Sequence, residues 1–152
     1  MRLTICAVGR AKAGPERVLY DHYVKRITSP LDLREVEDRK RLSGLQLMQR
    51  EAELLLAQVP EGAVIVALDE RGKNLTSAEF TTHLGDWRDH GTRHIAFLIG
   101  GADGLAPTLR TRADLLLSLS KLTWPHMLVR GLLAEQLYRS QCILAGHPYH
   151  RA

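Results

Sequence analysis

The chain has 152 residues, 45% of them hydrophobic and 25% charged, which predicts one globular domain over residues 1–152 and excludes a disordered chain. It has no run of 18 apolar residues, so no membrane-spanning helix is expected. The short apolar start is typical of a strand rather than an export signal, which makes the cytoplasm the expected compartment. The net charge of +4 is compatible with a polyanionic partner without requiring one.

The first half of the chain alternates strand and helix signals. The apolar run Leu3–Val8 predicts a strand, and the helical spacing of apolar residues predicts a helix over Pro15–Arg26. Alternating apolar and polar residues over Leu31–Val36 predict a half-buried strand. A basic loop at residues 39–41 precedes an amphipathic helix over Leu45–Val59.

The middle of the chain continues the same alternation. The run Ala63–Leu68 is almost entirely apolar, as in a strand buried on both faces. We expect a turn at residues 69–72. Thr76 then caps a helix, with Glu79 in capping-box register, and this helix extends to about His90.

The last third completes the pattern. Arg93–Ile99 predicts a second fully buried strand, followed by a short helix over Leu105–Ala113 and a strand over Leu115–Leu119. Pro125 occupies a position that tolerates a missing N–H, so the C-terminal helix is expected to begin there. Cys6 and Cys142 are expected to be buried, reduced thiols because each lies in an apolar pattern.

Five strands alternating with five helices predict an α/β fold with a mostly parallel sheet and helices on both faces. In such sheets ligands bind beyond the carboxyl ends of the strands. Three of those ends have unusual composition, and they lie at Leu68-Asp69, Ile99–Gly101 and Leu119–Thr123. The sequence therefore predicts a site where these three ends meet.

The glycine-rich segment Phe97–Leu105 has two open interpretations. Glycines permit positive φ and close approach of a ligand to the backbone. The spacing is not G-x-G-x-x-G, and no P-loop Lys-Ser/Thr follows, which excludes a dinucleotide fingerprint and a Walker loop. A tight strand-to-helix turn and a ligand-binding loop both remain.

The loop Ser118–Pro125 connects the last strand to the C-terminal helix. Its main-chain groups and apolar side chains could surround an adenosine. The alternative is a plain connecting loop with Thr123 near the helix N-cap.

The C-terminal helix carries polar groups on an otherwise apolar pattern. His126 and Arg130 are four residues apart and share a face, as do Glu135 and Arg139. Arg130 could hold a phosphate or a base edge with His126 nearby. The alternative is a histidine at a helix start with a surface arginine.

The tail His147-Pro-Tyr-His-Arg151 is aromatic and basic. A tyrosine between basic groups could stack on a base while the arginine contacts phosphate, whereas the alternative is a frayed terminus. The two histidines suggest zinc only weakly because the chain has no second Cys/His pair with ligand spacing, so no metal is expected.

Taken together, several segments resemble the SPOUT-class bacterial methyltransferases that act on N3 of a pseudouridine in 23S rRNA. The resemblance covers the whole chain, although Ser140 stands where that family commonly has alanine. Its most specific segments are Leu98–Leu105, Leu117–His126, Leu132–Arg139 and Pro148–Arg151.

The resemblance implies a C-terminal trefoil knot, a homodimer and S-adenosylmethionine as cofactor, with ribosomal RNA on the assembled ribosome as substrate. It implies that His126, Arg130, Tyr149, His150 and Arg151 face the RNA, with the tail completing the partner subunit's site. The implied cofactor contacts are Leu68, Gly101, Ser120, Lys121, Leu122, Thr123, Trp124 and Pro125.

His126 is our candidate proton acceptor because an imidazole with a pKa of about 6.5 suits removal of the N3 proton. The leading alternative function is a non-catalytic, basic α/β RNA-binding module. A nucleotide-dependent hydrolase or dehydrogenase is disfavoured, since the phosphate and dinucleotide fingerprints are absent.

Overall fold

The computed structural model of the chain describes residues 1–149, in which strands and helices alternate as predicted. The elements in chain order are β1 (Arg2–Val8), α1 (Pro15–Val24), β2 (Leu31–Val36), α2 (Gly44–Ala57), β3 (Val64–Asn74), α3 (Ser77–Asp89), β4 (His94–Ile99), α4 (Pro107–Arg112), β5 (Leu115–Ser118) and α5 (His126–Ala145).

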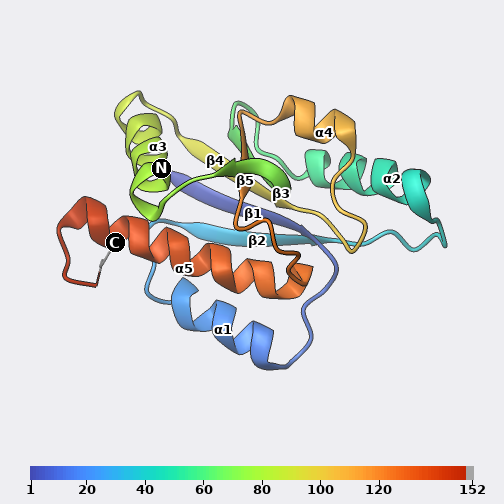
Figure 1. Cartoon of the computed structure of the whole chain (residues 1–152), viewed down its shortest axis with the longest axis horizontal. Helices are drawn as coiled ribbons and strands as arrows, with labels where there is room; N and C mark the ends of the chain where they lie inside the picture. The colour runs from blue at the N-terminus through green and yellow to red at the C-terminus, as the bar shows by residue number, and fades with distance from the viewer. Residues whose placement is uncertain (150–152) are drawn as a thin grey trace.

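The strands form one parallel sheet in the order β2-β1-β4-β3-β5. Helices cover both of its faces, with α1, α3 and α5 on one face and α2 and α4 on the other (Figure 1). The predicted α/β fold is confirmed. The trefoil knot that the resemblance implies stays a prediction.

Two apolar cores lie on opposite faces of the sheet because successive side chains of a strand alternate between faces. On β1, Ile5 and Ala7 pack with Leu133 and Leu137 of α5. Cys6, between them in sequence, packs on the other face with α2 and α4. Burying each of these two leucines stabilises the fold by roughly 2 kcal/mol.

Both cysteines are buried and unpaired, as predicted. Burial raises the pKa of the Cys6 thiol to about 11, which keeps it protonated. Within residues 1–149, none of the helices combines the length and apolar character needed to cross a membrane.

The structure corrects two expected boundaries. The turn expected at residues 69–72 is wrong, because β3 continues to Asn74 and pairs again with β5 after a shift in register between Leu68 and Lys73. A side chain at Gly72 would lie 2.5 Å from the carbonyl oxygen of Leu116, so this irregular pairing requires glycine. The helix expected from Leu105 begins at Pro107, a residue suited to the first helical position.

The start of α3 follows its predicted cap. The Thr76 hydroxyl accepts a hydrogen bond from the backbone N–H of Glu79 at 3.1 Å, which satisfies one of the amides left unpaired at a helix start.

Candidate functional site

The carboxyl ends of β3, β4 and β5 meet around a cavity of about 230 Å³, here called the loop cavity. This is the position that the parallel-sheet rule predicts. Its lining consists of Leu68, Asp69, Glu70, Arg71, Ile99, Gly100, Gly101, Ala102, Asp103, Gly104, Leu117, Leu119, Ser120, Leu122, Thr123, Trp124, His126 and Val129.

Six of the eight residues expected to contact a cofactor line the loop cavity, and they are Leu68, Gly101, Ser120, Leu122, Thr123 and Trp124. The other two, Lys121 and Pro125, belong to the same connecting segment but lie outside the lining. The structure therefore brings together strand ends separated by about fifty residues of sequence.

The glycine-rich segment after β4 forms a tight turn that also lines the loop cavity. The N–H of Gly104 donates to the carbonyl of Gly101 at 3.0 Å, and Gly104 has a φ of +83°. A side chain at Gly100 would lie 2.9 Å from the Gly104 carbonyl oxygen. The two interpretations of this segment are thus compatible.

The loop between β5 and α5 is shaped by its own short polar side chains. The Ser118 hydroxyl donates to the carbonyl of Ser120 at 2.9 Å, and the Ser120 hydroxyl accepts from the N–H of Leu122 at 2.9 Å. Thr123 does not cap α5, since its hydroxyl donates to Glu70 at 3.3 Å and the N-cap residue is Pro125.

The charged side chains of the loop cavity are mainly acidic. Asp69, Glu70 and Asp103 line it, together with the guanidinium of Arg71 and the imidazole of His126. Arg71 Nη1 lies 3.7 Å from Asp69 Oδ2, so the carboxylate partly neutralises the charge of the guanidinium. This set favours a ligand that carries positive charge over a nucleotide triphosphate.

His126, the first residue of α5, stands between two cavities. It lines the loop cavity and also a second cavity of about 450 Å³ between α1, β2 and α5, here called the helix cavity. A side chain at Gly9 would lie 2.9 Å from the Met127 methyl carbon and 3.5 Å from His126 Nε2. The end of β1 therefore packs directly against the start of α5.

Burial lowers the pKa of His126 below its usual value, and the nearby charge of Arg130 lowers it further. The imidazole is consequently neutral at neutral pH and retains a nitrogen lone pair.

Arg130 is buried, with 2% of its surface exposed, so the interpretation as a surface arginine is wrong. Its Nη1 lies 2.6 Å from Glu35 Oε2, and its Nη2 donates to the carbonyls of Val8 and Gly9 at 3.1 and 2.7 Å. Burial opposes ionisation of Glu35. Hydrogen bonds from Arg130 and the Ala11 N–H outweigh burial and hold the pKa of this carboxyl below its usual range. The ion pair ties α5 to the ends of β1 and β2.

The far end of α5 holds a separate polar cluster. Glu135 forms an ion pair with Arg139 at 2.5 Å and accepts a hydrogen bond from the Tyr149 hydroxyl at 3.1 Å. The Tyr149 ring packs edge-on against the Tyr138 ring, with centroids 4.8 Å apart. The Arg139 guanidinium lies 5.1 Å from the centroid of the Tyr149 ring. His150 and Arg151, also expected to face RNA, lie outside the described residues.

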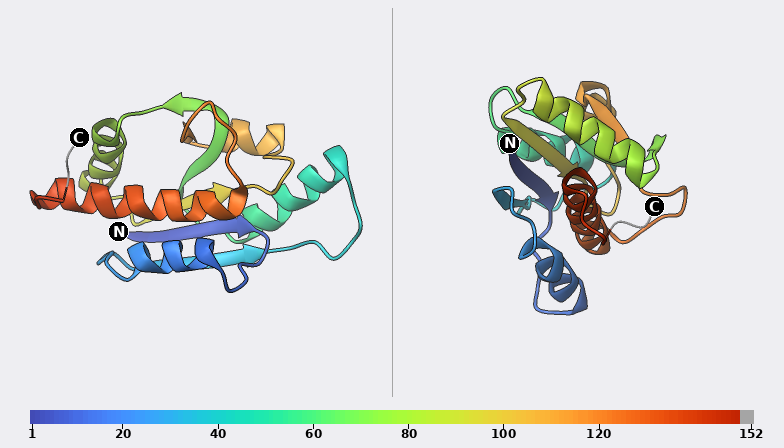
Figure 2. Two further views of the ribbon diagram at one scale, coloured as in Figure 1. Left: turned by 60° about the horizontal axis from the view of Figure 1, so that its bottom comes forward. Right: turned by 90° about the vertical axis from the view of Figure 1, so that its left-hand side faces the viewer.

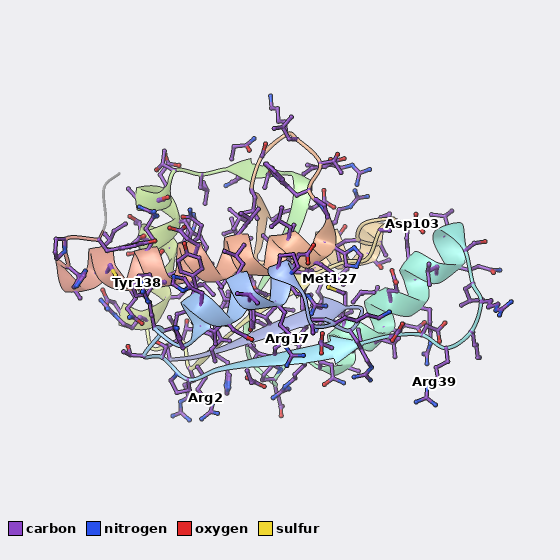
Figure 3. The ribbon with its side chains drawn as sticks, turned by 90° about the horizontal axis from the view of Figure 1, so that it is seen from below. Arg2, Arg17, Arg39, Asp103, Met127 and Tyr138 are labelled. Carbon is purple, nitrogen blue, oxygen red and sulfur yellow. The ribbon has the colours of Figure 1, made fainter. Side chains whose placement is uncertain are left out.

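Figure 3 shows Tyr138 and Met127 toward opposite ends of α5, with Arg17 of α1 near the Met127 end. Within one chain, the described part of the tail therefore does not reach His126.

Sequence reasoning missed Gly9 and Glu35, which complete the surroundings of His126 and Arg130. The available signal was their place at the carboxyl ends of β1 and β2, neighbours in the same parallel sheet. Among the described residues, no group of three or more His, Cys, Asp or Glu side chains is arranged to hold a metal ion.

Comparison with known proteins gives consistent matches over the full length. The family described as "Predicted SPOUT methyltransferase" matches residues 1–150. A protein of Rhodospirillum centenum named "Ribosomal RNA large subunit methyltransferase H" is 62% identical over all of both chains. Proteins with the same name from Paramagnetospirillum magneticum and Rhodospirillum rubrum are 60% identical over 99% of both chains and 53% identical over all of both chains.

Proposed function

The chain belongs to the SPOUT methyltransferase family, and from that premise we propose that it methylates N3 of a pseudouridine in 23S rRNA with S-adenosylmethionine as methyl donor. The observation that carries the proposal is the loop cavity, which joins three strand ends beside His126. The substrate would be the assembled ribosome, which places the protein in the cytoplasm.

The residues of the loop cavity fit S-adenosylmethionine. When bound, this cofactor supplies a methyl group on a positively charged sulfur. The carboxylates of Asp69, Glu70 and Asp103 complement positive charge, and the apolar side chains of Leu68, Leu122 and other residues suit an adenosine. The Gly101–Gly104 turn brings backbone groups to the cavity surface.

His126 would accept the proton that N3 must lose before its lone pair can attack the methyl carbon. His126 lines both the loop cavity and the neighbouring helix cavity, which supports this role. Its lowered pKa keeps it neutral and able to accept a proton at neutral pH. Methyl transfer otherwise depends mainly on positioning of the reactants.

Arg130 takes a revised role in this proposal. The family resemblance implies that it faces the RNA, but its side chain is 3% exposed and already bonded to Glu35 and two carbonyls. It would act as a positioning residue that fixes the start of α5, and with it His126, against the ends of β1 and β2.

The tail would reach the substrate through a homodimer. Tyr149 is bonded to Glu135, nine residues after His126 on α5, a separation of about 14 Å along a helix. Tyr149 can therefore join His126 in one site only if it comes from a second copy. Exposed apolar side chains at Val18 of α1 and Leu144 of α5 are available for such an interface.

The test is transfer of a labelled methyl group from S-adenosylmethionine to ribosomes, followed by mapping of the modified nucleotide. We expect the label on N3 of a large-subunit pseudouridine. Binding of S-adenosylmethionine without transfer would contradict this substrate. Absence of both binding and transfer would favour the non-catalytic RNA-binding module, whose RNA affinity would fall steeply with salt.

A further inference from the structure

None of the residues expected to contact the cofactor lines the helix cavity, which adjoins the loop cavity through His126. It lies between the β1–α1 segment, α1, β2 and the first turns of α5, where Figure 2 shows α1 running beside α5. Its volume of about 450 Å³ falls in the range of small-molecule sites. A group bound there would lie next to the proposed proton acceptor.

Glu35 gives this cavity a fixed hydrogen-bond acceptor. One carboxylate oxygen, Oε2, accepts from Arg130 Nη1 and from the Ala11 N–H, both at 2.6 Å. The other, Oε1, accepts no hydrogen bond from any described residue, and the side chain is 22% exposed. The carboxyl stays ionised because its pKa is lowered, so it can only accept.

The wall and rim of the helix cavity also suit a nucleotide. Leu33 and Met127 give it apolar surface, and the buried Tyr20 hydroxyl has no hydrogen-bond partner among the described residues. The rim carries the basic side chains of Arg10, Lys12 and Arg17 alongside the carboxylates of Glu16 and Asp21.

Two of these basic side chains are held only loosely. Arg10 pairs with Glu37 and Arg17 with Asp21, each at 3.8 Å and largely exposed to solvent. Such surface pairs contribute little stability and are easily exchanged for phosphates.

We propose that the helix cavity receives the target base of the RNA, with Glu35 Oε1 accepting a hydrogen bond from N1–H of pseudouridine. This inference rests on the proposed function. Pseudouridine is joined to ribose through carbon, so both ring nitrogens carry a hydrogen. Methylation replaces the hydrogen on N3, so N1–H is the ring donor that remains free to form a hydrogen bond.

Uridine lacks that donor because its N1 is bonded to ribose. Bound in the same pose, it would leave Glu35 Oε1 without a partner in a partly desolvated cavity. Sites built to bond a particular N–H or O–H reject analogues that lack it much more strongly than apolar pockets reject a missing methylene. Glu35 would therefore be a specificity-determining residue.

The first test changes Glu35→Gln and compares ribosomes carrying pseudouridine with ribosomes carrying uridine at the target position. The glutamine carbonyl would be retained by Arg130 and Ala11, which places its NH₂ group where Oε1 was. We expect the wild-type preference for pseudouridine to fall by about tenfold or more, with S-adenosylmethionine affinity unchanged. An unchanged preference would overturn the role of Glu35.

Because Glu35→Gln also weakens a buried ion pair, a second variant leaves that pair intact. Ala13→Trp places a large ring at the exposed mouth of the helix cavity, and Ala57→Trp at an exposed position of α2 is the matched control. We expect Ala13→Trp to lower kcat/KM for ribosomes by about tenfold or more, with cofactor affinity unchanged, whereas Ala57→Trp methylates normally.

Three results would overturn the assignment of the base to this cavity. Normal methylation by Ala13→Trp would show that the cavity is not used. Loss of cofactor affinity in Ala13→Trp would show that the cavity serves the cofactor. Loss of the dimer in parallel with activity, measured by sedimentation, would assign the cavity to the partner's tail. A wild-type protein that transfers no methyl group would instead contradict the proposed function itself.

Discussion

The two ends of α5 hold their charged groups in different ways. At the start of the helix, Arg130 reaches Glu35 and the carbonyls of Val8 and Gly9, more than ninety residues away in sequence. At the other end, Glu135 forms an ion pair with Arg139 and accepts a hydrogen bond from Tyr149, and all three lie within fourteen residues of sequence. The charged group of the first end is fixed by distant segments of the fold, whereas Glu135 at the second end bonds within the helix and its tail. The first can therefore shape a site within its own chain, while the second would offer groups to a partner in the proposed homodimer.

The largest expected effect comes from removing the buried ion pair at the start of α5. Arg130→Met should lower the free energy of unfolding by about 3–5 kcal/mol, because it leaves the Glu35 carboxylate and two carbonyls without their partner. The matched change at the other end, Arg139→Met, should cost about 1 kcal/mol, since that pair is more exposed and local. Urea unfolding measures both, and equal losses would contradict the contrast between the two ends.

The next effect concerns the pH dependence of methyl transfer. His126 must be neutral to accept a proton, and its pKa lies below the usual value through burial and the Arg130 charge. The rate should be independent of His126 ionisation at neutral pH and above, and should fall as the pH drops through that lowered pKa. His126→Ala should remove this acidic limb and slow the single-turnover rate by about 10²-fold or more. A variant with the wild-type rate and profile would exclude His126 as the acceptor.

The smallest expected effect is on stability and concerns Ser140, near the C-terminal end of α5. Ser140 is 1% exposed, and its hydroxyl accepts a hydrogen bond from Thr81 at 2.9 Å. The Thr81 hydroxyl also lies 2.7 Å from the Ser77 carbonyl, so it keeps an acceptor without Ser140. Ser140→Ala should therefore cost about 1 kcal/mol or less in thermal or urea unfolding and leave cofactor affinity unchanged. A loss as large as that of Arg130→Met would contradict the contrast between the two ends.

The sequence allowed most of the architecture to be predicted because its apolar periodicities are strong and local. The buried runs of β3 and β4, the Thr76 cap and the three strand ends of the loop cavity all follow from short-range pattern and the parallel-sheet rule. The extension of β3 beyond Leu68 could not be predicted, since it depends on pairing with β5 over polar residues.

The surroundings of His126 were also beyond prediction. Arg130 has the same local spacing whether it points to solvent or pairs with a strand residue, and only the packing of α5 against the sheet decides between them. Glu35 stands on a half-buried strand where a carboxylate is ordinary. The helix cavity forms only when α1, β2 and α5 come together.

The most direct test of the contrast between the two ends of α5 is a subunit-mixing experiment. The His126→Ala and Arg151→Ala proteins, each expected to methylate poorly on its own, are unfolded together, refolded and assayed on ribosomes. If the tail acts in the partner's site, each mixed dimer contains one intact site, and a symmetric dimer should regain about a quarter of the wild-type activity. Failure of the mixture to exceed either variant, with mixed dimers verified by mass, would contradict a site shared between two chains.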